Sequence, residues 1–80
     1  MRKALVFEAR RDGYGIDQIA DHAMTVAELK EILDDYNDDT LIVMSHDRGY
    51  TYGSINVYDS YEAQESDDGE WENNGELVNW

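Results

Sequence analysis

Hydrophobic residues recur with a helical period after Met24, and charged residues occupy the positions between them. Thr25 and Glu28 have the spacing of a capping box, in which a hydroxyl and a carboxylate each accept a backbone N–H at the start of a helix. Met24 precedes the box and is expected to contact Leu29. The sequence therefore predicts a helix over 26–36 with only one face built for burial. The residues of that face are Val26, Leu29, Ile32, Leu33 and Tyr36.

Two segments on either side of this helix have the patterns of β-strands. Residues 3–10 (KALVFEAR) have one strongly apolar face, and residues 40–46 (TLIVMSH) are apolar on both faces. A strand that is apolar on both faces lies inside a sheet, so 40–46 is predicted as the central strand with 3–10 paired beside it. Residues 47–49 (DRG) follow as a compact hairpin turn in which glycine is free to take the left-handed conformation.

A third strand is predicted over residues 50–58 (YTYGSINVY), which alternate in polarity. Ile55 and Val57 lie on the face that is expected to pack on the helix. The opposite face carries a tyrosine stripe, which suits a binding surface as well as simple shielding of the sheet. The stripe consists of Tyr50, Tyr52 and Tyr58.

The remaining segments have weaker patterns. Residues 12–13 (DG) predict a turn, and residues 14–21 fit either a short polar strand or one helical turn, of which we favour the extended form. Residues 59–74 predict an acidic loop or a ragged strand extension. Residues 75–80 fit a short edge strand, with Trp80 either capping the core or exposed to a partner.

These elements predict a single α+β domain over residues 1–80. Its sheet has three or four strands, is mainly antiparallel, and carries the helix on one face. Eighty residues lie near the lower limit for one hydrophobic core. The chain has no cysteine for disulfides, and its first residues lack the apolar run of a targeting segment or a membrane span, so a cytoplasmic location is expected.

The charge of the chain is large and uneven. Nineteen acidic residues against six basic residues give a formal net charge of −13. Residues 1–11 contribute +3, so residues 12–80 contribute −16, and from Asp59 onward there are eight acids and no base. This charge opposes non-specific attraction to nucleic acid or anionic lipid and favours a basic partner, although solubility alone is the simpler explanation.

No pattern of catalytic or metal-binding residues is complete. His22 and His46 lie on different predicted elements, without the spacing of a metal motif. Residues 59–70 have acids at the first and twelfth positions of a calcium loop, but Gln64 replaces the glycine that its sharp turn needs. Residues 45–47 (SHD) are consecutive in a strand, so their side chains alternate between faces and cannot form a hydrolytic relay. We therefore expect no enzyme activity, no metal and no cofactor.

Protein contacts remain as the expected function. Carboxylates spaced along a helix and a loop can imitate a nucleic-acid backbone, which carries roughly one negative charge per 1.7 Å of duplex axis. Such a surface would compete for a basic nucleic-acid-binding groove, while aromatic side chains hold the complex. The residues expected to bind the partner are Glu31, Asp34, Asp35, Asp38, Asp39, Tyr50, Tyr52, Asp59, Glu62, Glu65, Asp67, Asp68, Glu70, Trp71 and Glu72.

Residues 25–54 contain the pattern T-V-x-E-L-x-x-x-L, an acidic turn, a short T-x-I-V strand and the segment Y-T-Y-G-S. This stretch resembles a group of small uncharacterised proteins of phages and prophages. Small acidic phage proteins include anti-CRISPR proteins and restriction inhibitors, several of which act as DNA mimics. The resemblance implies an inhibitor of a host defence nucleoprotein complex, such as a CRISPR effector, acting in the host cytoplasm. The alternative is a phage structural or assembly protein that forms a homo-oligomer, such as a homodimer, through its tyrosines and Trp80.

Overall fold

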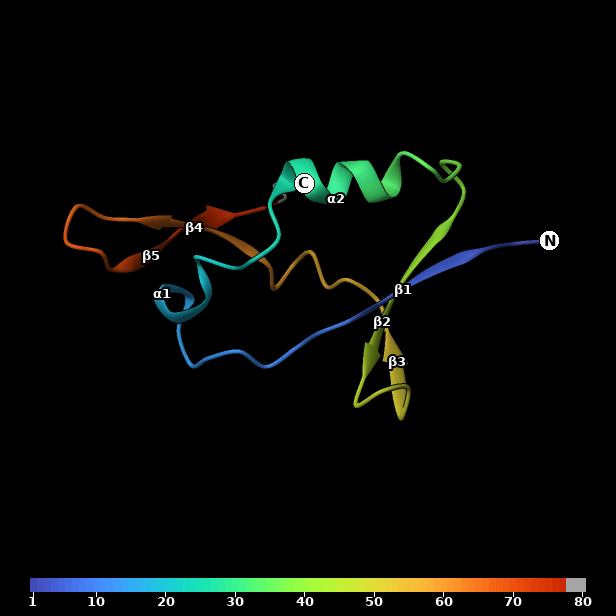
Figure 1. The fold of residues 1–80 in the computed structure, drawn as a ribbon, viewed down its shortest axis with the longest axis horizontal. Helices are drawn as coiled ribbons and strands as arrows, with labels where there is room; N and C mark the ends of the chain where they lie inside the picture. The colour runs from blue at the N-terminus through green and yellow to red at the C-terminus, as the bar shows by residue number, and fades with distance from the viewer. Residues whose placement is uncertain (78–80) are drawn as a thin grey trace. The chain divides into compact units, whose positions relative to one another are not determined.

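The structure, a computed structural model, describes residues 1–77, which divide into two compact units (Figure 1). Unit 1 comprises Met1–Arg11 and His22–Ile55, and unit 2 comprises Asp12–Asp21 and the chain from Asn56 onward. The predicted role of Trp80 lies outside the described residues. The fold class is α+β as predicted, but the arrangement is not one sheet with one helix, because two separate sheets and two short helices are present.

Unit 1 contains a three-stranded sheet in the order β1 (Ala4–Glu8), β2 (Leu41–His46) and β3 (Thr51–Gly53) (Figure 1). The prediction of a central strand flanked by the N-terminal strand is confirmed. The sheet is mixed rather than mainly antiparallel, because β1 runs parallel to β2 while β3 runs antiparallel to it. A parallel pair needs a long crossover connection, and the chain between β1 and β2 supplies it.

The turn between β2 and β3 is confirmed, and it depends on left-handed backbone. Asp47, Arg48 and Gly49 have φ values of 52°, 58° and 90°. The N–H of Tyr50 closes the turn by donating to the carbonyl of His46 at 3.0 Å. This geometry returns the chain beside β2 in an antiparallel direction.

The third strand is shorter than the predicted 50–58, because β3 ends at Gly53. Beyond Gly53, local side-chain hydrogen bonds replace the hydrogen bonds of the strand ladder. Asn56 Nδ2 donates to Asp59 Oδ2 at 2.7 Å, and Ser60 Oγ donates to the carbonyl of Asn56 at 2.6 Å. Such bonds offer the backbone an alternative to a strand ladder. The predicted tyrosine stripe on one strand face is therefore wrong, since Tyr58 lies outside β3 and belongs to unit 2.

Helix α2 (Val26–Leu33) begins with the predicted capping box. The N–H of Glu28 donates to Thr25 Oγ1 at 3.2 Å, and the N–H of Thr25 donates to Glu28 Oε1 at 3.1 Å. The helix ends at Leu33, three residues before the predicted end at position 36. Asp34, Asp35 and Asn37 follow Leu33 closely, and aspartate and asparagine favour turns over helix interiors because their side chains compete for backbone groups.

The predicted covering of the sheet by this helix is not found. The close backbone approaches between elements of unit 1 are concentrated in the paired strands, and α2 has few or none with any strand. The exposed fractions along its apolar face run from 36% at Leu33 to 70% at Val26. No hydrophobic residue among residues 1–77 is fully buried. An open apolar groove lies between α2 and the sheet instead.

Unit 2 contains the short helix α1 (Ile16–Ile19) and a two-stranded antiparallel sheet of β4 (Tyr61–Glu65) and β5 (Trp71–Glu76). The extended form that we favoured for residues 14–21 is wrong. Residues 16–19 form the single helical turn α1 instead, which is closed by the N–H of Ala20 donating to the carbonyl of Ile16 at 2.9 Å. Residues 59–74 were predicted as an acidic loop or a ragged strand extension. The loop is wrong for most of this segment, which is extended, but β4 and β5 form a separate hairpin rather than an extension of β3.

Candidate functional site

The two units differ sharply in charge, although both come from one acidic chain. Unit 2 contains eleven acidic residues and no lysine or arginine, which gives it a formal charge of −11. Unit 1 contains eight acidic and six basic residues and has a formal charge of −2. Asp12–Asp21 and the acidic C-terminal segment thus belong to one unit, and all six basic residues belong to the other.

The residues that we expected to bind a partner are divided between the two units. Those in unit 1 lie on α2, in the turn after it, and around β3: Glu31, Asp34, Asp35, Asp38, Asp39, Tyr50 and Tyr52. Those in unit 2 lie on the β4–β5 hairpin and in the turn before it: Asp59, Glu62, Glu65, Asp67, Asp68, Glu70, Trp71 and Glu72. Only the second set lies in a unit without basic residues.

The hairpin in unit 2 presents its carboxylates on paired strands. Gln64 pairs with Glu72, and Glu65 pairs with Trp71. Glu62, Glu65 and Glu72 are all exposed. Neighbouring strands lie about 4.8 Å apart, and alternate residues of one strand are roughly 7 Å apart. The hairpin therefore holds several negative charges at fixed short spacings.

The tip of the hairpin is built by one of its own acids. The carboxylate of Asp68 accepts hydrogen bonds from Ser66 Oγ and from the N–H of Glu70. These hydrogen bonds, first that from Ser66 and then that from Glu70, hold the pKa of Asp68 below its ordinary value. Gly69 completes the turn with a φ of 86°. Asp68 is thus a loop-forming residue as well as a charge, whereas neighbouring Asp67 is simply an exposed acid.

Aromatic and acidic side chains also line a shallow pocket of about 480 Å³ within unit 2. Tyr14 and Asp17 come from the first segment of the unit, and Tyr61, Glu70 and Trp71 come from the hairpin. Trp71 Nε1 is buried without a hydrogen-bond partner, and it is the one such side-chain atom found among the described residues. Sequence reasoning missed Tyr14 and Asp17, since nothing local indicates that they lie beside the hairpin.

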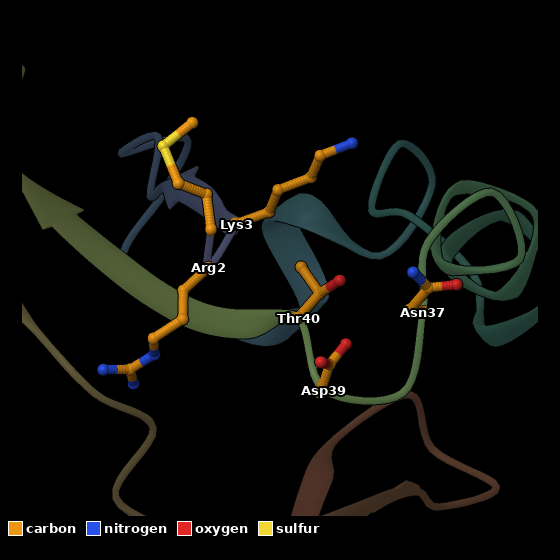
Figure 2. Close-up of a pocket in the computed structure, with 6 residues that line it drawn as sticks. Arg2, Lys3, Asn37, Asp39 and Thr40 are labelled. Atoms are coloured by element: carbon orange, nitrogen blue, oxygen red, sulfur yellow. The ribbon is translucent and has the colours of Figure 1, made fainter.

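In unit 1, part of the expected acidic surface lies beside basic residues. Arg2, Lys3 and Asp39 line one hollow of about 320 Å³, together with Asn37 and Thr40. Figure 2 shows the Arg2 and Lys3 side chains extending in different directions from the segment just before β1. The hollow follows from the start of the β1–β2 pairing, where the N–H of Leu41 donates to the carbonyl of Lys3 at 3.0 Å. This end of unit 1 therefore presents both signs of charge.

The two tyrosines expected to bind a partner in unit 1 are open to solvent. The exposed fraction is 84% for Tyr50 and 63% for Tyr52. Tyr50 lies in the turn and Tyr52 on β3, so they belong to one hairpin. They are accessible anchors, but they lie in the unit whose charge is nearly balanced.

The titratable groups of the described residues were also compared with the requirements of a metal site. Residues 1–77 contain no cluster of three or more histidine or acidic side chains placed to hold a metal ion. The carboxyls of Glu28 and Asp68 have lowered pKa values, and hydrogen bonds at exposed positions cause both shifts. Neither of the helices in this part of the chain has the length and apolar character needed to cross a membrane.

What the site can do is therefore set by its charge and by its exposed aromatic residues. A dense negative surface attracts a basic partner, and accessible rings supply contact area. Comparisons with protein-family models, with curated proteins and with solved structures gave no match, so the resemblance to small phage proteins stays a prediction from the sequence.

Proposed function

We propose that this protein is a non-catalytic inhibitor that binds a basic nucleic-acid-binding surface, of the kind that phages direct against host defence complexes. Unit 2 supplies the acidic surface. The observation that supports this proposal is the segregation of charge, with eleven acids and no base in unit 2. Solubility alone explains a high net charge, but it does not require all six basic residues to lie in one unit and leave the other with acids only.

The proposal has a clear physical basis. A basic groove that binds nucleic acid releases counterions and gains affinity when a dense array of negative charge replaces them. The exposed carboxylates of Glu62, Glu65 and Glu72, carried on the two paired strands of the β4–β5 hairpin, offer such an array. Long-range attraction accelerates the encounter, and the exposed ring of Tyr61, with the partly accessible Trp71, then supplies close contact. Binding by this route weakens as salt concentration rises.

Charge reversal in the two units tests the proposal. The first variant carries Glu62→Lys, Glu65→Lys and Glu72→Lys on the hairpin. The matched control carries three reversals in unit 1, which change the net charge by the same amount: Glu31→Lys, Asp34→Lys and Asp35→Lys. Each protein is used as bait in a bacterial lysate, and captured proteins are displaced with duplex DNA and, separately, with increasing salt.

We expect the wild-type protein and the unit 1 control to capture the same nucleic-acid-binding proteins and to release them to DNA. The hairpin variant should lose them. Equal capture by all three proteins would overturn the assignment to unit 2. Capture that duplex DNA does not displace would overturn competition for a nucleic-acid-binding groove.

A further inference from the structure

The apolar groove in unit 1 is a second surface that the acidic function does not use. Its volume is about 350 Å³, and every residue that lines it is hydrophobic. A neighbouring hollow shares Leu33 and Ile42 with the groove and adds Leu5 and Tyr36, beside the polar residues 37, 38 and 40. The apolar surface thus extends to Tyr36 and ends at the turn after α2. The groove is lined from the helix side by Met24, Leu29 and Leu33, and from the sheet side by Phe7, Ile42 and Met44.

The surface around this groove is large enough for a stable interface. Seven large side chains have exposed fractions between 36% and 70%: five line the groove or the neighbouring hollow, and Val26 and Ile32 belong to the apolar face of α2 beside it. Each side chain has on the order of 100 Å² of apolar surface, and about half of it is exposed. The seven side chains of one copy therefore expose roughly 350 Å² of apolar surface. Homodimer interfaces are about 65% apolar, so two such faces correspond to an interface of roughly 1,100 Å². A specific interface needs about 1,000 Å². The seven residues are Met24, Val26, Leu29, Ile32, Leu33, Tyr36 and Ile55.

The charge of unit 1 is compatible with a second copy of the same chain. Its six bases and eight acids nearly balance, so two copies of unit 1 meet with little net repulsion. Both signs occur in each copy, with the bases Arg2 and Lys3 just before β1 and acids along α2. A twofold arrangement brings the same patch of each copy together, which suits a surface that carries both signs. Repulsion comes mainly from unit 2, with −11 in each copy.

We propose that the protein forms a twofold homodimer through the apolar groove of unit 1, with the α2 face of each copy packed against the other. This inference does not rest on the function proposed for unit 2. The two kinds of binding respond to salt in opposite directions. Salt screens the repulsion between the two acidic units and strengthens the dimer, whereas it weakens the capture of a basic partner.

Sedimentation equilibrium of the full chain at low and high salt tests the dimer. We expect a monomer–dimer equilibrium whose dissociation constant falls as NaCl rises from 0.05 to 0.5 M. Val26→Lys, at a 70% exposed position of the α2 face, should raise the dissociation constant at least tenfold. The matched control is Val6→Lys, since Val6 is 54% exposed and alternates on β1 with the groove-lining Phe7. Far-UV circular dichroism checks that both variants keep their secondary structure.

A second measurement avoids any dependence on the folding of the lysine variants. The chain has no cysteine, so Val26→Cys introduces a single thiol into a nearly unchanged side chain. Its rate of alkylation should fall as protein concentration rises through the dissociation constant, and the rate for Val6→Cys should not. A monomer at all salt and protein concentrations, open-ended association, or equal effects at positions 6 and 26 would each overturn the proposal.

Discussion

The turn at Gly49 gives a quantitative test of the unit 1 hairpin. Gly49 has a φ of 90°, and a β-carbon at this position would lie 2.8 Å from Tyr52 Oη. Left-handed backbone costs a non-glycine residue about 1–2 kcal/mol. The tyrosine ring must also move, and an off-rotamer side chain costs about 0.5–1.5 kcal/mol. Because Oη is the far end of an exposed side chain, the low end of that second range applies.

We therefore expect Gly49→Ala to lower the free energy of unfolding by about 1.5–2.5 kcal/mol. In a Tyr52→Phe background the hydroxyl is absent, and only the backbone cost of about 1–2 kcal/mol should remain. Gly69→Ala is the matched control, since Gly69 has a φ of 86° and no atom lies within 4 Å of the point that a β-carbon would occupy there.

Urea unfolding followed by circular dichroism measures these differences. With a slope near 1 kcal/mol per M, the midpoint of Gly49→Ala should fall by about 1.5–2.5 M. A Gly49→Ala protein as stable as the wild type would refute the requirement for left-handed backbone at this turn. The same loss in the tyrosine and phenylalanine backgrounds would refute the position of Tyr52 over Gly49. The second result bears on function, because Tyr52 is one of the expected partner-binding residues.

Two further predictions concern the helix start in unit 1 and the hairpin in unit 2. Thr25→Ala removes the side-chain cap of α2 and should cost about 1 kcal/mol in thermal unfolding, whereas Thr25→Ser should cost little. Hydrogen bonds from Thr25 hold the pKa of Glu28 below its ordinary value of 4.5. The ionised Glu28 carboxylate therefore stabilises the protein fully above about pH 4.5, and this stabilisation is lost as the pH falls through the lowered pKa. In thermal melts recorded at a series of pH values, Glu28→Gln should abolish this pH-dependent loss. Trp71→Phe removes the buried, unpartnered N–H of the hairpin, which costs about 1–3 kcal/mol in the native protein. The melting temperature of Trp71→Phe should equal or exceed that of the wild type, and the melting temperature of Trp71→Ala should be lower. A Phe variant as unstable as the Ala variant would show that the N–H has a partner.

The sequence contains a signal for the β4–β5 turn, but the acidic composition around it favoured a loop. Asp68 and Gly69 form the Asp-Gly dipeptide that is typical of tight turns, and short alternating segments flank it. The acidity of residues 59–74 favoured a loop, because glutamate and aspartate are uncommon in strands. The structure pairs the two flanks as β4 and β5 across that turn. Polar strands form here because the turn geometry and the ladder hydrogen bonds, rather than burial, decide the local structure.

The sequence by itself determined the elements whose stabilising contacts are local. The capping box of Thr25 and Glu28, the central strand and the turn at 47–49 all depend on residues within a few positions of each other, and all are confirmed. The length of α2 was overestimated because the apolar period continues to Tyr36, while the backbone leaves the helix at Asp34.

Only the tertiary structure decided the features that bear on function. The parallel pairing of β1 with β2 joins residues 37 positions apart, as in Ala4 with Leu41, and no local pattern fixes its direction. The grouping of Asp12–Asp21 with the C-terminal hairpin likewise joins distant segments, and it turns an uneven charge along the chain into one strongly acidic unit and one nearly neutral unit. The sequence also predicted an apolar helix face without showing what would cover it, because amphipathic periodicity specifies burial but not the partner surface.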